Sequence, residues 1–201
     1  MDSEKFYNTL SLNVLESFAK KTFGKNPSSD FEQIMEYINP KMSVLEIGTG
    51  TGRIGIELIK KGFNYTGIER EARFLDIFKS KLQEIRFDSE KVDLIQMPFE
   101  DFPKDKKYDI ILFSWSVLMD FSKEEQGEIL KKSYNLLLDD GVCIIDNPSE
   151  NQKHNEVDEF TPTLFHYNDW TNSFDKLGFN HESKIYKTKT NIERELIILR
   201  K

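Results

Sequence analysis

After about forty residues, short apolar runs alternate with longer amphipathic segments along the chain. This alternation is typical of strands joined by crossover helices, and it predicts an α/β fold with a mostly parallel sheet. The five internal strand candidates are short and rich in branched aliphatic and aromatic residues: Ser43–Ile47, Tyr65–Ile68, Val92–Gln96, Tyr108–Ser114 and Val142–Asp146. Two later runs, Phe179–Lys187 and Glu193–Arg200, flank a Thr190-Asn191 turn and predict a closing antiparallel hairpin. We therefore expect an open, doubly wound sheet of about seven strands.

Segments with apolar residues at helical spacing lie between these strands. Ser122 and Glu125 have the spacing of a capping box, which marks the start of one of them. The predicted helices of this part of the chain are Arg53–Lys61, Glu71–Phe87, Ser122–Leu138 and Asp169–Leu177. Asp139-Asp140-Gly141 then predicts a turn before the fifth strand.

The first forty residues break the alternation and are predicted to be helical. Ser29 and Glu32 form a second capping pair before an apolar stripe, and Asn39-Pro40 ends that segment. We expect a helical flank or lid over residues 1–40 and one α/β domain over residues 41–201. A polar stretch over residues 147–161 is long for a connection and predicts either a functional loop or a mobile one.

Composition narrows the class of protein. The 201 residues are 38% apolar and 31% charged, which are globular proportions. The net charge of −7 lacks the basic footprint of a nucleic-acid binder, so we expect no nucleic-acid partner. One cysteine, Cys143, allows neither a disulfide framework nor a cysteine metal site, and this favours the cytoplasm. No window approaches the length of a membrane span, and the three histidines lack metal-ligand spacing, so we expect neither a membrane nor a metal partner.

The most informative segment is a glycine-rich turn that joins the first predicted strand to a helix. Gly48, Gly50 and Gly52 alternate with threonines, and glycine lets the backbone turn tightly and approach a ligand closely. The helix start that follows offers free N–H groups to a carboxylate, ribose or phosphate. Glu46 lies two residues before the first glycine on an otherwise apolar strand, so it needs a cationic or N–H partner. Gly50, Gly52 and Gly55 also fit the dinucleotide pattern, which leaves a nicotinamide-dependent oxidoreductase open.

An acid followed by Gly-x-Gly-x-Gly at the end of the first strand resembles motif one of the class I S-adenosylmethionine-dependent methyltransferases. The resemblance extends over roughly residues 43–200. It implies that S-adenosyl-L-methionine is the cofactor, with its methionine part held by Glu46, Gly48, Thr49, Gly50 and Gly52.

Glu69 ends the second predicted strand and is followed by Arg70, and we expect both residues to bind the cofactor. A carboxylate at the carboxyl end of a strand can accept hydrogen bonds from both hydroxyls of a ribose. A nicotinamide-dependent oxidoreductase has an acid at the same place. Glu69 therefore predicts a ribose in the ligand but does not distinguish S-adenosylmethionine from a nicotinamide cofactor.

The segment after the third strand resembles the adenine-binding segment of the same family, with one departure. Pro98 stands where the family commonly has an aspartate, and proline offers neither a side-chain acceptor nor an N–H. The resemblance then implies that adenine rests on Met97 and Phe99, with Glu100 as a further polar partner. Ser114 ends the fourth strand, where the family places residues that face cofactor and substrate.

Methyl transfer from a sulfonium is an in-line displacement in which the protein aligns the acceptor and supplies a base where one is needed. Candidate catalytic residues are His166, His154 and Tyr7, and the acceptor side also draws on Trp115, Ser116, Asn147, Tyr167 and Trp170. We expect a small-molecule acceptor. The alternatives are a protein methyltransferase with the same cofactor, the oxidoreductase above, and a binding module without turnover.

Overall fold

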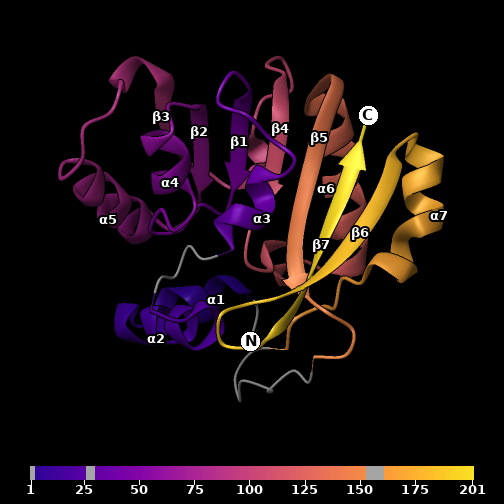
Figure 1. The fold of residues 1–201 in the computed structure, drawn as a ribbon, viewed down its shortest axis with the longest axis horizontal. Helices are drawn as coiled ribbons and strands as arrows, with labels where there is room; N and C mark the ends of the chain where they lie inside the picture. The colour runs from indigo at the N-terminus through magenta and orange to yellow at the C-terminus, as the bar shows by residue number, and fades with distance from the viewer. Residues whose placement is uncertain (1–2, 26–29, 153–160) are drawn as a thin grey trace.

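A seven-stranded sheet runs through the computed structural model, which describes residues 3–25, 30–152 and 161–201. The strands lie in the order β3-β2-β1-β4-β5-β7-β6, as Figure 1 shows from left to right. Their bounds are β1 Ser43–Ile47, β2 Asn64–Glu69, β3 Val92–Gln96, β4 Tyr108–Phe113, β5 Leu137–Pro148, β6 Asn180–Lys187 and β7 Glu193–Arg200.

Strands β1 to β5 pair in parallel, whereas β7 runs antiparallel to both β5 and β6. The chain moves outward from β1 through β2 to β3 and then crosses back to β4 on the other side of β1. Dinucleotide-binding sheets keep the order 3-2-1-4-5-6 without an inserted antiparallel strand. The predicted fold, an open and mostly parallel sheet with an antiparallel hairpin at its C-terminal end, is confirmed.

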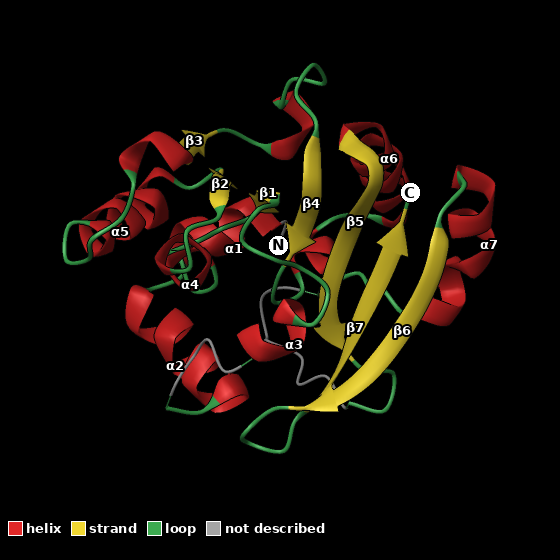
Figure 2. Cartoon of the chain, turned by 45° about the horizontal axis from the view of Figure 1, so that its top comes forward, coloured by secondary structure: helices red, strands yellow, loops and turns green. Residues whose placement is uncertain are grey.

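Helices cover both faces of the sheet, as the red ribbons in Figure 2 show. The apolar cluster on one face joins the sheet to α3, α4 and α5, and the cluster on the other face joins it to α6 and α7. Because both faces are covered, the central strands are apolar throughout, and residues 110–113 of β4 are all fully buried. The helices are α1 Ser3–Thr9, α2 Leu12–Phe23, α3 Phe31–Met35, α4 Gly55–Lys60, α5 Ala72–Leu82, α6 Lys123–Leu136 and α7 Tyr167–Leu177. None of the described helices has the length and apolarity needed to cross a bilayer.

Several predicted boundaries differ from the observed ones, and three of the differences have a clear structural cause. The turn expected at Asp139-Asp140-Gly141 lies within β5, where Asp140 has a φ of 65° and the pairing with β4 shifts. This strand therefore starts at Leu137, immediately after α6, and bulges before its regular part. The helix expected over Arg53–Lys61 starts only at Gly55, because the glycine turn extends further. The helix expected to reach Phe87 ends at Leu82, where the next N–H groups bond three residues back instead of four.

The capping box at the start of α6 is confirmed, since both reciprocal hydrogen bonds of Ser122 and Glu125 are present. Ser29, the other predicted cap, lies outside the described residues. In Figure 1, α1 and α2 lie below the sheet, at the edge where the β4 and β5 arrowheads point. Helix α3, by contrast, is buried in the cluster that contains α4 and α5. The division of the chain at residue 40 stays a prediction.

Candidate active site

A pocket lies at the carboxyl ends of β1, β2, β3 and β4, on either side of the point where the strand order reverses. Ligands of open α/β sheets bind at this switch point because the loops diverge there. The strands contribute Ile47 and Ile68, and the loops after them contribute most of the polar groups. Tyr7 of α1 and Leu15 of α2 also line the pocket, so the two N-terminal helices cover its mouth.

The glycine turn forms one wall of the pocket. Gly48, Gly50 and Gly52 have φ values of 66°, 54° and 82°, a backbone region that side chains disfavour. A Cβ at Gly48 would lie 2.8 Å from a methyl of Val117, and a Cβ at Gly52 would lie 2.3 Å from the Phe78 ring. A Cβ at Gly50 would meet nothing closer than 4.0 Å. The first and third glycines thus allow close packing, whereas Gly50 leaves an open cradle on the pocket side.

Glu69 is fixed beside this cradle by two backbone hydrogen bonds. Its Oε2 accepts from the Gly50 N–H at 2.8 Å, and its Oε1 accepts from the Glu71 N–H at 2.8 Å. Burial raises the pKa of the carboxyl, and these two N–H groups lower it. Each carboxylate oxygen has two lone pairs, so the carboxylate keeps acceptor capacity for further donors in the pocket. Glu69 therefore joins the glycine turn to the end of β2 and presents acceptors to a ligand.

Glu46 lies behind the turn and is 1% exposed. Its carboxylate accepts hydrogen bonds from three hydroxyls, those of Tyr65 at 2.6 Å, Thr49 at 3.1 Å and Ser114 at 2.9 Å. The expected cationic or N–H group is not among the hydrogen-bond partners in the described structure, where hydroxyls take that role, and the charge of Arg53 acts on the carboxyl only through space. Burial raises the pKa of this carboxyl, and the hydroxyl bonds oppose that shift. The carboxyl thus ties β1, the glycine turn and the end of β4 together.

Two consecutive residues after β4, Trp115 and Ser116, adopt left-handed φ values of 52° and 69°. Non-glycine residues are strained there, and such strain gathers at functional sites. Asp146 of β5 stabilises the turn, because its carboxylate accepts from the Trp115 N–H at 3.1 Å and its carbonyl accepts from the Ser116 N–H at 2.7 Å. Arg194 of β7 forks onto the same carboxylate at 2.8–3.1 Å. This buried pair fixes a turn whose tryptophan lines the pocket.

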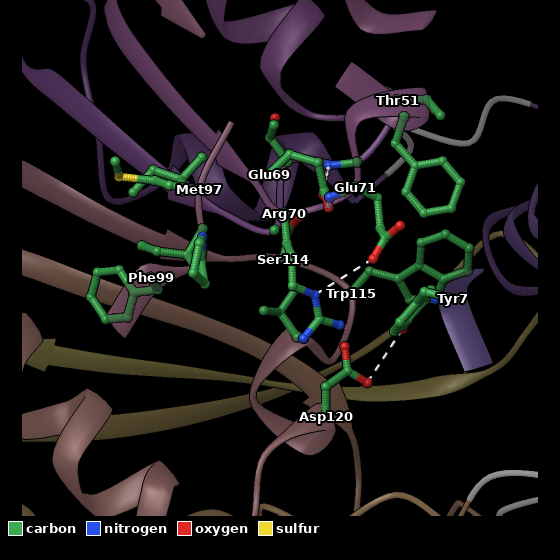
Figure 3. A pocket seen from close by; sticks show the side chains of 18 of the residues that line it. Tyr7, Thr51, Glu69, Arg70, Glu71, Met97, Phe99, Ser114, Trp115 and Asp120 are labelled. Atoms are coloured by element: carbon green, nitrogen blue, oxygen red, sulfur yellow. Dashed lines mark hydrogen bonds and ion pairs between the residues drawn. The ribbon is translucent and has the colours of Figure 1, made fainter. Parts of the chain in front are cut away.

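Asp120 enters the pocket at the end of a short 3-10 helix, Val117–Asp120. The Tyr7 hydroxyl donates to its Oδ1 at 3.3 Å. Figure 3 shows this bond as a dashed line, with the Arg70 side chain above the carboxylate. A second dashed line joins Arg70 to Glu71, whose facing atoms are 3.6 Å apart.

Comparison with known proteins identifies the family. Residues 38–192, which are most of the chain, match the family model described as "Methyltransferase domain". The chain belongs to this family. The methyltransferase domain thus includes every strand of the sheet except β7, and it includes every predicted cofactor residue.

Similar proteins extend this assignment. The alpha N-terminal protein methyltransferase 1 of Dictyostelium discoideum is 34% identical over 106 residues, which are 51% of this chain and 38% of that protein. The ribosomal RNA small subunit methyltransferase A of Malacoplasma penetrans (strain HF-2) is 32% identical over 74 residues, 37% of this chain and 26% of that protein. The chain spans 26% to 41% of the length of the curated relatives it matches.

Among solved structures, the methyltransferase domain resembles the magnesium protoporphyrin IX methyltransferase of Synechocystis PCC 6803, crystallised with bound SAM. The TM-score is 0.70 at 16% identity, and the alignment covers 97% of this chain and 88% of that one. At this identity the likeness concerns the fold.

Most of the predicted cofactor residues of the methyltransferase domain come together in the pocket. Two do not line it: Glu46 is bonded behind the glycine turn, and Gly52 faces Phe78. Those that line the pocket are Gly48, Thr49, Gly50, Glu69, Arg70, Phe99, Glu100 and Ser114.

The predicted catalytic residues are placed differently from one another. Tyr7 lines the pocket, His166 caps the start of α7 and does not line it, and His154 lies outside the described residues. Sequence reasoning missed Asp120 as a pocket residue and Asp146 with Arg194 as a support. Within the described parts of the chain, no group of three or more His, Cys, Asp or Glu side chains is arranged to hold a metal ion.

Proposed function

We propose that this domain transfers a methyl group from S-adenosylmethionine to a small-molecule acceptor. The observation that carries this proposal is Glu69, an anchored carboxylate that faces an open glycine cradle at the switch point of a methyltransferase-family sheet. Bound there, S-adenosylmethionine supplies an activated methyl on a sulfonium.

The pocket residues divide into three groups that fit the three parts of this cofactor. Gly48, Thr49 and Gly50 offer a side-chain-free wall to the methionine part. Glu69 offers acceptors to the ribose hydroxyls. Met97 and Phe99 offer an apolar wall to adenine. Phe99 is held rigidly because its ring packs edge-on against the Phe113 ring, with the two ring centroids 6.0 Å apart.

Pro98 alters this adenine wall in a specific way. It precedes the 3-10 helix Phe99–Asp101 and gives it a fixed start, since proline presets its own φ and has no N–H to leave unpaired. Lys132 of α6 donates to the Phe99 and Glu100 carbonyls at 2.7 and 2.8 Å. The segment is therefore held through its backbone. We propose that this rigidity positions the adenine ring, in place of the aspartate side chain that the family commonly has at the position of Pro98.

The covered mouth of the pocket supports a small acceptor. Tyr7, Leu15, Trp115 and Phe121 also line the pocket, and none of them is assigned to a part of the cofactor. Aromatic and apolar walls of this kind suit an organic molecule that enters the chamber whole. The net charge of −7 opposes binding to a phosphate backbone.

A protein acceptor is the second candidate, and the 34% identity to an N-terminal protein methyltransferase over half of this chain favours it. The two are separated by incubating the purified protein with methyl-labelled S-adenosylmethionine and a cell extract, followed by separation by size. We expect label in the small-molecule fraction, and a Glu69→Ala variant should abolish it at low cofactor concentration. Label in the protein fraction would replace the small acceptor with the second candidate. Cofactor binding without labelling of either fraction would favour a module without turnover.

A further inference from the structure

Asp120 is a carboxylate inside the pocket that the cofactor groups described above leave unused. It is half-buried and lies on the side covered by α1, beside Tyr7 and below Arg70 in Figure 3. Glu71 also lines the pocket, but its carboxylate is paired with Arg70, with the facing atoms 3.6 Å apart. Of the other side chains that line the uncommitted part of the pocket, Asp120 can accept a proton, whereas Tyr7, Leu15 and Phe121 cannot.

The short helix that carries Asp120 is held rigidly. The buried Gln126 amide of α6 donates to the Leu118 carbonyl at 3.0 Å and to the Phe121 carbonyl at 3.2 Å. The Thr163 N–H donates to the Met119 carbonyl at 2.9 Å, and the Thr163 carbonyl accepts from the same Gln126 amide at 3.1 Å. These bonds bracket Asp120, so its backbone position is fixed before any ligand enters.

The same helix lies directly against the glycine turn. Val117 is in such close contact with Gly48 that a Cβ on that glycine would be 2.8 Å from a Val117 methyl. Val117 and Asp120 are three residues apart and therefore share one face of a 3-10 helix. Asp120 thus faces the region next to the wall that we assign to the methionine part, where the reacting methyl has to be delivered.

The carboxyl has one protein partner and one available oxygen. Oδ1 accepts the Tyr7 hydroxyl from α1, and in the described part of the chain no hydrogen bond reaches Oδ2. The charged groups that face it are Arg70 and Glu69 from the end of β2. Burial raises the pKa of Asp120 to about 7, and Glu69 adds to this shift, while the Tyr7 hydrogen bond and the Arg70 charge oppose it. A general base works best when its pKa lies close to the operating pH.

We propose that Asp120 receives the proton that the acceptor loses, and that the acceptor therefore reacts through an O–H or N–H group. This inference rests on the proposed function. A lone pair of the acceptor oxygen or nitrogen forms the bond to the methyl carbon, and the bond from that carbon to the sulfonium sulfur breaks with its electrons on sulfur. The acceptor's proton passes to Asp120 Oδ2 and then to solvent. A carboxylate or thioether acceptor has no proton to lose and would leave Asp120 without a role.

A binding experiment tests the placement of Asp120 without knowledge of the acceptor. S-adenosylmethionine and S-adenosylhomocysteine differ by the methyl and the sulfonium charge, so contacts to their common parts cancel in the ratio of the two affinities. An ionised Asp120 near the sulfonium favours the charged ligand by Coulomb attraction. We expect calorimetric titration of the full chain to show that the affinity for S-adenosylmethionine, divided by that for S-adenosylhomocysteine, rises about three- to tenfold between pH 5.5 and 8.5. The midpoint of this rise should lie near pH 7.

The controls separate this inference from the proposed function. Asp120→Asn should give a ratio that does not change with pH, and Asp76→Asn, at an exposed position on α5, should behave like the unmodified chain. If both ligands bind the unmodified chain with a ratio independent of pH, the role of Asp120 is overturned while the proposed function stands. If neither ligand binds, the proposed function fails and this inference fails with it.

Turnover of an acceptor panel provides the second readout. With phenols and amines as acceptors, Asp120→Asn should lower kcat about 100-fold or more and remove the rise of kcat through pH 7, whereas KM for the cofactor should rise by no more than about three- to tenfold. Tyr7→Phe should shift that rise to higher pH, because the Tyr7 hydrogen bond lowers the pKa of Asp120. An unchanged pH profile in Asp120→Asn would contradict the role of base.

Discussion

Glu69 is the residue on which cofactor affinity depends most in this account. Its carboxylate is anchored by the N–H groups of Gly50 and Glu71 and offers its remaining lone pairs to the ribose. Charge-assisted hydrogen bonds contribute roughly 1.5–3 kcal/mol each. We therefore expect Glu69→Ala to weaken S-adenosylmethionine binding by about 2–3 kcal/mol, on the order of 30- to 150-fold, in a calorimetric titration. The control, Glu84→Ala, removes an exposed acid after α5. An equal affinity of both variants would contradict the ribose contact.

The glycine turn makes a prediction about stability. Gly52 and Gly62 both have positive φ values, 82° and 84°, but only Gly52 is in tight contact with a neighbour, the Phe78 ring. Gly62→Ala should cost about 1–2 kcal/mol for the backbone conformation alone. Gly52→Ala should cost about 1–3 kcal/mol more, because its Cβ would overlap the ring. Urea unfolding measures the free energy of unfolding of both variants. Equal losses would show that the contact between residue 52 and the Phe78 ring does not contribute to stability.

At this scale, the sequence predicted residues that belong to a continuous motif and missed those that depend on the fold. Glu69 and the glycines were found because a strand, a turn and a strand end are local features. Asp120 meets Tyr7 across a separation of 113 residues, and nothing beside it in the sequence marks it as a pocket residue. The hydroxyl partners of Glu46 were likewise hidden, since they come from three different elements.

The Asp146–Arg194 pair makes a prediction at the scale of elements, because it joins β5, β7 and the turn after β4. Both side chains are almost fully buried, and the carboxylate also accepts the Tyr186 hydroxyl at 2.8 Å. Removal of one partner leaves a buried charge, so Arg194→Met should cost about 3–5 kcal/mol of unfolding free energy. Arg200→Met, at the exposed end of β7, should cost less than about 1 kcal/mol.

A double-mutant cycle measures how far the pair acts as a unit. Asp146→Asn combined with Arg194→Met should lose less than the sum of the two single variants, because the second substitution removes a charge that the first left without its partner. Additive losses would contradict the role of the pair in holding the Trp115–Ser116 turn.

The order of elements was predictable from the sequence, whereas some of their ends were not. Buried parallel strands are continuous apolar runs, so β1 to β4 were found close to their observed bounds. β5 was found only in its apolar part, because Asp139-Asp140-Gly141 has the composition of a turn and still pairs as a bulged strand start. Pairing with β4 makes these residues part of a strand, and this long-range contact cannot be predicted from local composition.

For the molecule as a whole, the net charge of −7 predicts weak association with polyanions. We expect no retention on immobilised heparin, and no shift of RNA in a gel, at physiological ionic strength. Tight binding of either would contradict the small-molecule acceptor and would favour a substrate like that of the ribosomal RNA methyltransferase among the relatives.

The N-terminal helices and the sheet form one pocket, and its cofactor is the claim on which the other assignments depend. One measurement tests that claim most directly: parallel calorimetric titration of the purified chain with S-adenosylmethionine, S-adenosylhomocysteine and NADH. The account predicts binding of the first two in the micromolar range and no detectable heat of binding with NADH. Binding of NADH alone would assign the glycine turn to the Gly50, Gly52 and Gly55 pattern and would contradict methyl transfer.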